Sequence, residues 1–165
     1  MNILLVNTTK MVGDTGGLAK VTSAFANEMH KRGHTVSVIY ADERSGDFFF
    51  PIDEDIKCYD VRLQNGKRIK YPLSLRLKRE FYRLFSKQKA RTVNSDFFYK
   101  YICPYMGKII KGIQPDIIVS FTPGTSKSLI IDLNLQDKVP IITMSHGNPE
   151  DYFDFYPVLS LEAVK

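Results

Sequence analysis

Cysteine is scarce in this 165-residue sequence, and the two that occur, Cys58 and Cys103, are too few for a disulfide framework. Their spacing does not match that of a zinc site either. We therefore expect two reduced thiols in a cytoplasmic protein, because thiols in the cytosol stay reduced.

Long apolar runs are also missing. No stretch approaches the roughly 18 apolar residues that a membrane-spanning helix needs. The apolar start at residues 2–7 lacks the basic beginning and the cleavage site of a secretory signal. These absences exclude a bilayer span, but they leave attachment to a membrane surface open.

The composition is that of one ordinary globular domain. Hydrophobic residues make up 44% of the chain and charged residues 25%, which excludes a disordered chain, and no repeat or low-complexity tract is present. A length of 165 residues suits a single domain that covers residues 1–165.

Buried-strand patterns alternate with helical patterns along the chain. Helices are predicted at residues 18–29, 72–91, 95–112 and 126–133. Strands are predicted at residues 3–6, 36–40, 58–61, 117–121 and 140–145. This alternation predicts an α/β fold with a Rossmann-like, doubly wound parallel sheet in three αβα layers. Numbering the strands along the chain, we expect the order 3-2-1-4-5.

Ligands of such sheets bind beyond the carboxyl ends of the strands. Residues 7–17, 121–126 and 145–150 follow three of the predicted strands and carry polar groups. Gly13, Gly16 and Gly17 lie between the first strand and the first helix, where free N–H groups favour an anion. The glycines also suit a plain turn with close helix packing.

Two nucleotide-binding fingerprints are absent from the glycine loop. The sequence contains neither the G-x-G-x-x-G pattern nor the phosphate loop that ends in Gly-Lys-Ser/Thr. Asp42 follows the second predicted strand, where a dinucleotide site would have its ribose-binding acid. A dinucleotide-dependent oxidoreductase therefore stays a weak alternative.

Four segments in order resemble the retaining glycosyltransferases of family GT4. Residues 16–21 (GGLAKV) resemble the Gly-Gly-x-x-Arg/Lys-Val opening of that family, and residues 32–39 (RGHTVSVI) resemble the segment that follows it. Residues 116–120 (DIIVS) and 145–147 (SHG) fall at the family's fourth and fifth strands. The resemblance spans about residues 1–150.

The resemblance implies the amino-terminal half of a GT-B enzyme. Such a domain binds the acceptor, a glycan or a lipid-linked sugar, while a second domain holds the nucleotide-sugar donor. Hexosyl transfer would retain the anomeric configuration without metal or cofactor, in the synthesis of a bacterial surface polysaccharide such as capsule or O-antigen. The family's Glu-x₇-Glu motif of the second domain is absent here. We therefore expect this chain alone to be inactive; a stand-alone nucleotide- or anion-binding module without catalysis is the alternative.

The same resemblance implies five site residues. Gly16 and Gly17 match the glycine pair near the donor diphosphate and the acceptor, and Lys20 belongs to the same motif. His146 matches a histidine near the transferred sugar and is the expected catalytic residue, followed by Gly147. A neutral imidazole can accept or donate a hydrogen bond to a sugar hydroxyl.

Two further hydroxyl side chains are candidates for binding the acceptor. Thr122 and Ser126 follow the fourth predicted strand, although helix capping explains them as well. His34 at the amino end of the second strand and His30 on the first helix are expected to be structural or solvated.

Residues 67–91, which begin with Lys67 and end with Arg91, are strongly basic. They carry ten basic residues and one acid, a net charge of +9. One helical face is apolar, which suits an anionic membrane surface at the inner face of the cell membrane. The alternative is an ordinary surface helix whose apolar face packs on the sheet. We expect no nucleic-acid partner, because no nucleic-acid-binding module is visible.

Overall fold

A five-stranded parallel sheet forms the centre of the computed structural model, which describes residues 1–144, 146 and 162. The strand order β3-β2-β1-β6-β7 confirms the order expected from the sequence. Every neighbouring pair of these strands is parallel. The strands are β1 (Asn2–Asn7), β2 (Thr35–Tyr40), β3 (Lys57–Asp60), β6 (Ile117–Ser120) and β7 (Ile141–Thr143).

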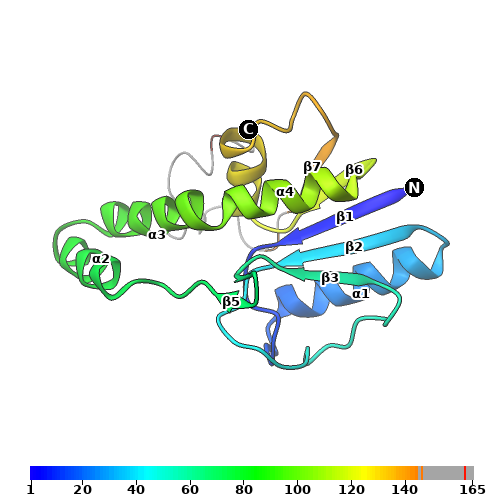
Figure 1. The fold of residues 1–165 in the computed structure, drawn as a ribbon, viewed down its shortest axis with the longest axis horizontal. Helices are drawn as coiled ribbons and strands as arrows, with labels where there is room; N and C mark the ends of the chain where they lie inside the picture. Colours follow the sequence, from blue (N-terminus) through cyan, green and yellow to red (C-terminus); the bar gives the residue numbers. More distant parts are fainter. Residues whose placement is uncertain (145, 147–161, 163–165) are drawn as a thin grey trace.

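Helices cover both faces of this sheet, as Figure 1 shows. Side chains alternate along β1, so Ile3 and Leu5 share an apolar cluster with α1 (Gly17–Lys31). Leu4 and Val6 face the other way, into a cluster with α4 (Cys103–Ile113). The fold is thus the expected three-layer Rossmann-like α/β arrangement.

The predicted helix at 72–91 is wrong in its length, because the chain breaks at Ser86. The structure has two helices here, α2 (Leu73–Phe85) and α3 (Lys87–Tyr101). Ser86 has extended backbone angles, and its hydroxyl accepts a hydrogen bond from the Lys89 N–H at 3.3 Å. Serine is a favoured N-cap residue. The break was missed in the sequence because the helical periodicity continues on both sides of Ser86.

The predicted helix at 95–112 is likewise wrong, because it joins the end of α3 to α4. Pro104 lies in the first turn of α4 and has no N–H to continue α3. The predicted helix at 126–133 begins earlier, as α5 (Pro123–Lys127), and continues as the π-helical turn η1 (Ser128–Asp132).

A small hairpin was missed by the strand predictions. β4 (Leu63–Gln64) and β5 (Lys67–Arg68) pair antiparallel around Asn65 and Gly66. Both turn residues have positive φ, 50° and 73°, which the Asn-Gly pair tolerates well. The Asn-Gly pair was therefore the available signal in the sequence.

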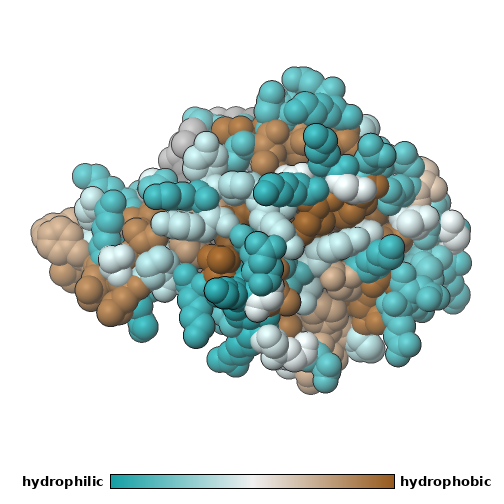
Figure 2. Space-filling view, in the orientation of Figure 1, coloured by the Kyte–Doolittle hydropathy of each residue, from teal (hydrophilic) through white to brown (hydrophobic). Residues whose placement is uncertain are grey.

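Helix α2 lies at one end of the molecule, beyond the sheet (Figure 1). No residue of α2 is buried. Figure 2 shows hydrophobic side chains gathered at this end of the molecule. The apolar face of α2 consists of five side chains that keep between 59% and 80% of their accessible surface: Leu73, Leu77, Phe81, Leu84 and Phe85. The alternative in which this face packs on the sheet is therefore wrong.

None of the helices in the described part of the chain combines the length and the hydropathy that crossing a bilayer requires.

Leucines in the sheet and on α2 are expected to differ sharply in their contribution to stability. Leu4 is fully buried, so Leu4→Ala is expected to lower the free energy of unfolding by about 2–5 kcal/mol. Leu84→Ala on the exposed face of α2 is expected to change it by less than about 0.5 kcal/mol. Urea denaturation of both variants measures the difference, and equal losses would contradict this placement of α2.

Candidate functional site

Hydrogen bonds between threonines join the loop after β1 to the start of α5 at the carboxyl edge of the sheet. The hydroxyl of Thr8, just after β1, lies 2.6 Å from that of Thr125, after β6. The Thr125 hydroxyl also lies 2.9 Å from that of Thr122. The loop after β1 and the first turn of α5, which are 117 residues apart in the chain, are therefore held side by side.

The hydroxyls of Thr122 and Ser126 are used inside the domain. Thr122 accepts a hydrogen bond from the Thr125 N–H at 3.1 Å and so caps α5. Ser126 is fully buried, donates to the Ser120 hydroxyl at 2.7 Å, and lies 2.8 Å from the Thr143 hydroxyl. These bonds join β6 to β7. Contact of Thr122 and Ser126 with an acceptor stays a prediction.

The imidazole of His146 stacks on the ring of Phe121. The ring centroids are 5.6 Å apart and the planes differ by 7°. Phe121 is almost fully buried, and the edge of Phe25 from α1 packs against it. His146 is exposed, so the stack presents the imidazole at the surface on the α1 side of the edge. Gly147 lies outside the described residues.

The first turn of α1 has no acidic side chain and no side-chain cap. Gly16 is the N-cap residue, and its N–H donates to Asp14 Oδ1 at 3.3 Å. A Cβ on Gly16 would lie 3.1 Å from Asp14 Oδ2, whereas a Cβ on Gly17 would meet nothing within 4 Å. Gly17 and Lys20 are exposed on this turn. The positive end of the helix dipole therefore faces open space at Gly17.

Asp42 holds the loop that leads into α1. Its carboxylate accepts hydrogen bonds from the N–H groups of Met11 at 2.8 Å, Val12 at 2.9 Å and Arg44 at 3.0 Å. Burial raises the pKa of Asp42, but hydrogen bonds from these N–H groups and that of Glu43 outweigh burial and leave the pKa below its ordinary value. This use of the carboxylate leaves the oxidoreductase alternative without support.

Asn7 is a second anchor of the same loop, and the sequence reasoning missed it. It is fully buried at the end of β1. Its Nδ2 donates to the Thr22 hydroxyl on α1 at 2.9 Å, and its Oδ1 accepts from the Thr9 hydroxyl at 2.6 Å. A polar residue that closes a run of buried apolar residues was the available signal.

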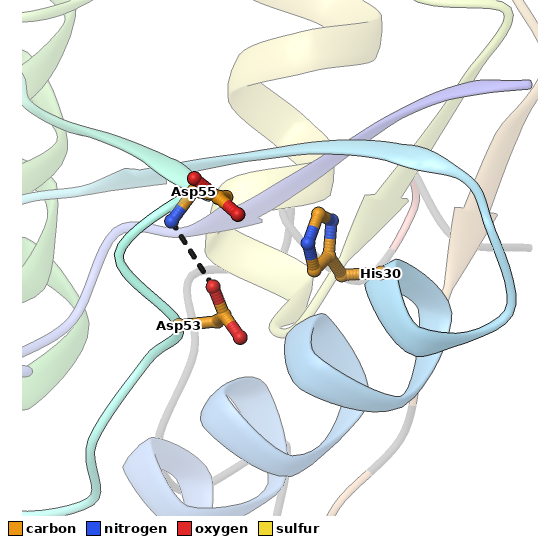
Figure 3. Close-up of side chains that lie close together, drawn as sticks. All are labelled: His30, Asp53 and Asp55. Carbon is orange, nitrogen blue, oxygen red and sulfur yellow. Dashed lines mark hydrogen bonds between the residues drawn. The ribbon is translucent and has the colours of Figure 1, made fainter.

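Three side chains with metal-ligating atoms lie close together at the other edge of the sheet. His30, Asp53 and Asp55 have ligand atoms within 4.8 Å of one another (Figure 3). Asp53 Oδ1 accepts from the Asp55 N–H at 3.0 Å, an ordinary loop contact. His30 and Asp55 line a hollow with the first residues of β1, β2 and β3. This cluster is therefore remote from the carboxyl edge.

Neither cysteine forms a disulfide, and neither supplies a reactive thiolate. Burial raises the pKa of Cys58 and of Cys103 to about 11, so both thiols are protonated at neutral pH.

The sheet order and the glycine-capped helix at its carboxyl edge define a Rossmann-like domain. The family model described as Glycosyltransferase Family 4 matches residues 15–163. The chain therefore belongs to glycosyltransferase family 4. No protein in the curated collection matches it.

Solved glycosyltransferase structures share the fold at low sequence identity. Sucrose-phosphate synthase from Thermosynechococcus elongatus has a TM-score of 0.56 and 9% identity, with 99% of this chain and 39% of that chain covered. The glycosyltransferase SsfS6 from Streptomyces sp. SF2575 has a TM-score of 0.50 and 13% identity, with 99% and 42% covered. The chain thus spans about two fifths of these GT-B enzymes.

Asp42→Asn is expected to destabilise the domain by about 1.5–3 kcal/mol at pH 7, because the N–H groups of the loop lose a charged acceptor. The folded-state pKa of Asp42 is lowered, so its carboxylate stabilises the fold above the unfolded pKa of about 3.9. This contribution disappears as the pH falls through the folded pKa. Urea titrations from pH 7 to pH 3 measure the difference between the two proteins.

The matched control is Asp137→Asn, at an exposed position. It is expected to leave stability at pH 7 within about 0.5 kcal/mol of the wild type. A gap between wild type and Asp42→Asn that stays constant down to pH 3 would contradict the proposed role of the carboxylate.

Proposed function

We propose that this chain is the amino-terminal, acceptor-binding domain of a retaining glycosyltransferase. The enzyme transfers a hexosyl group from a nucleotide-sugar donor to a glycan or lipid-linked acceptor, in the synthesis of a bacterial surface polysaccharide. The match to glycosyltransferase family 4 over residues 15–163 carries the proposal. The donor class is supported by the Streptomyces enzyme, whose structure is described in complex with thymidine diphosphate.

The carboxyl edge of the sheet supplies groups that suit this chemistry. Retaining transfer develops negative charge on the departing diphosphate, and N–H groups at the start of α1, next to Gly16 and Gly17, would stabilise it. His146 is exposed on its aromatic support and would hydrogen-bond a hydroxyl of the transferred sugar. No carboxylate nucleophile of this chain is required, and no metal or cofactor is invoked.

Three of the larger hollows among the described residues are lined by neither Gly17 nor His146. The chain spans about two fifths of the glycosyltransferases whose fold it shares. The chain alone is therefore proposed to be inactive, and the donor-binding domain is assigned to a further part of the protein.

Gly17→Leu is expected to lower transfer by the protein that carries both domains about a hundredfold, because a side chain there occupies the space in front of α1. The fold has room for the substitution, so the melting temperature is expected to stay within a few degrees of the wild type. Radiolabelled sugar transfer and thermal unfolding are the two measurements.

Gly112→Leu is the matched control, since a Cβ at Gly112 also meets nothing within 4 Å and this residue lines the hollow at the amino edge. Full activity is expected for this variant. Transfer by the 165-residue chain alone would refute its assignment as half of the active site. A reading frame that ends at residue 165 would instead favour a stand-alone binding module.

The exposed apolar face of α2 is assigned to an anionic membrane surface. Ten basic residues in the segment 67–91 complement the charge of acidic lipids. Exposed leucine and phenylalanine side chains, flanked by Arg76 and Lys78, are the composition of a helix that lies in the interface. The enzyme would thus act on a lipid-linked acceptor at the inner face of the cell membrane.

The protein is expected to float with vesicles of phosphatidylcholine that contain phosphatidylglycerol, and not with phosphatidylcholine alone. Replacing Leu77 and Phe81 by serine is expected to weaken binding at least about tenfold, because each buried side chain contributes roughly 1.5–3 kcal/mol. Ile131→Ser, an exposed apolar residue outside α2, is the control and should bind normally. Equal binding to neutral vesicles would contradict the assignment.

A further inference from the structure

A basic cavity lies where α2 and α3 meet the hairpin of β4 and β5. Its volume is about 700 Å³, within the range of small-molecule sites. A smaller hollow of about 450 Å³ adjoins it and shares Arg79 and Asn94 with it. The basic side chains that line the larger cavity are Arg62, Arg68, Lys70, Arg76 and Arg79.

Positive charge dominates both hollows. Glu43 is the one acidic residue in the lining of the larger cavity, against five basic residues. The lining of the smaller hollow contains Arg79, Arg83, Lys87 and Arg91 and no acid. Like charges gathered in a concave space repel one another and focus the field on an incoming anion.

Two arginines form fixed walls of the basic cavity. Arg68 pairs with Asp60 at 2.5 Å and donates to the Ser45 hydroxyl at 2.9 Å. Arg79 is held by Glu80, with nitrogen–oxygen distances of 2.7 and 3.0 Å. Ordered guanidinium groups of this kind lose little conformational entropy when a ligand arrives.

Other polar groups in the lining have hydrogen-bonding capacity left. The Nε of Arg62 and the Oη of Tyr71 are buried and make no hydrogen bond within the described residues. Nη1 of Arg62 forms an ion pair with Glu43 Oε1 at 3.4 Å. In the described part of the chain, the side chains of Lys70 and Arg76 have no ion pair or hydrogen bond.

The basic cavity opens at the same edge of the sheet as the glycine start of α1. Glu43 follows the end of β2, and Arg62 follows the end of β3, so both belong to the carboxyl edge. The cavity also lies next to α2, which contributes Arg76 and Arg79 to its lining. A ligand bound here would therefore lie between the outer helix and the carboxyl edge.

We propose that the basic cavity is a phosphate-binding site that holds the phosphate or diphosphate group of the acceptor. Phosphate fits this lining better than a neutral sugar does, because arginine forks bind its oxygens in pairs and lysine supplies a further charge. The proposal rests on the proposed function for the identity of the ligand as acceptor. Binding of the phosphate group itself does not depend on transfer.

Inorganic pyrophosphate is the probe, and isothermal titration calorimetry on the 165-residue chain is the measurement. The wild type is expected to bind it, and replacing Lys70 and Arg76 by glutamine is expected to weaken binding roughly tenfold or more. Neither side chain is buried, so the fold should persist, as thermal unfolding checks. The control variant replaces Lys111 and Lys138, two exposed lysines outside the cavity, by glutamine and so loses the same charge.

A wild type that does not bind pyrophosphate would overturn the proposal. So would a cavity variant that binds as tightly as the control variant, because binding would then follow net charge alone. A second arm compares flotation on phosphatidylcholine vesicles with and without a polyprenyl diphosphate. If the wild type floats only with vesicles that contain the diphosphate lipid, and the cavity variant does not, the ligand is a lipid-linked phosphate. If the protein binds pyrophosphate but the diphosphate lipid does not increase flotation, the ligand is a soluble phosphate.

These outcomes separate the site from the proposed function. The protein with both domains could transfer no sugar while pyrophosphate binding still depends on Lys70 and Arg76. The cavity would then be an anion-binding site, but its ligand would not be a sugar acceptor. Normal transfer that is unchanged in the cavity variant would overturn the acceptor role of the cavity while leaving the glycosyltransferase assignment intact.

Discussion

The carboxylate of Asp42 ties the loop after β1 to the end of β2, and much of the carboxyl edge depends on it. It accepts hydrogen bonds from Met11 and Val12, which lie about thirty residues earlier in the chain. Arg68 extends this anchor, because it donates to the Asp42 carbonyl and pairs with Asp60 at the end of β3. One network of buried charges therefore positions both the glycine start of α1 and a wall of the basic cavity.

The domain consists of a buried sheet with its covering helices and of α2, which lies beyond the sheet. The two apolar clusters that stabilise the fold lie against the sheet, with α1 on one face and α4 on the other. The apolar face of α2 adds nothing to either cluster. This apolar face is exposed, while Arg76 and Arg79 of the same helix line the basic cavity.

Much of the sheet was predictable, because each buried strand is a local run of apolar residues bounded by polar loops. The parallel sheet followed from the alternation of strands and helices, and the expected strand order was confirmed, although the alternation fits more than one order. Helix α1 followed from its apolar spacing and from Gly33. The helix boundaries at Ser86 and Pro104 were missed, because apolar periodicity continues across both breaks. The described residues of the candidate site lie at the carboxyl edge, but their hydrogen-bond partners were not foreseen.

The sequence by itself determined the layered fold and the edge that gathers the polar loops and the glycine start of α1, since strand and helix patterns are local and parallel strands end on one side. Only the tertiary structure decided which polar groups remain available. Ser126 and Asp42 were candidates for contact with a ligand and are bonded inside the domain, while the side chains of Lys70 and Arg76 make no hydrogen bond or ion pair in the described part of the chain. These outcomes depend on neighbours remote in the chain, whose positions no local pattern encodes.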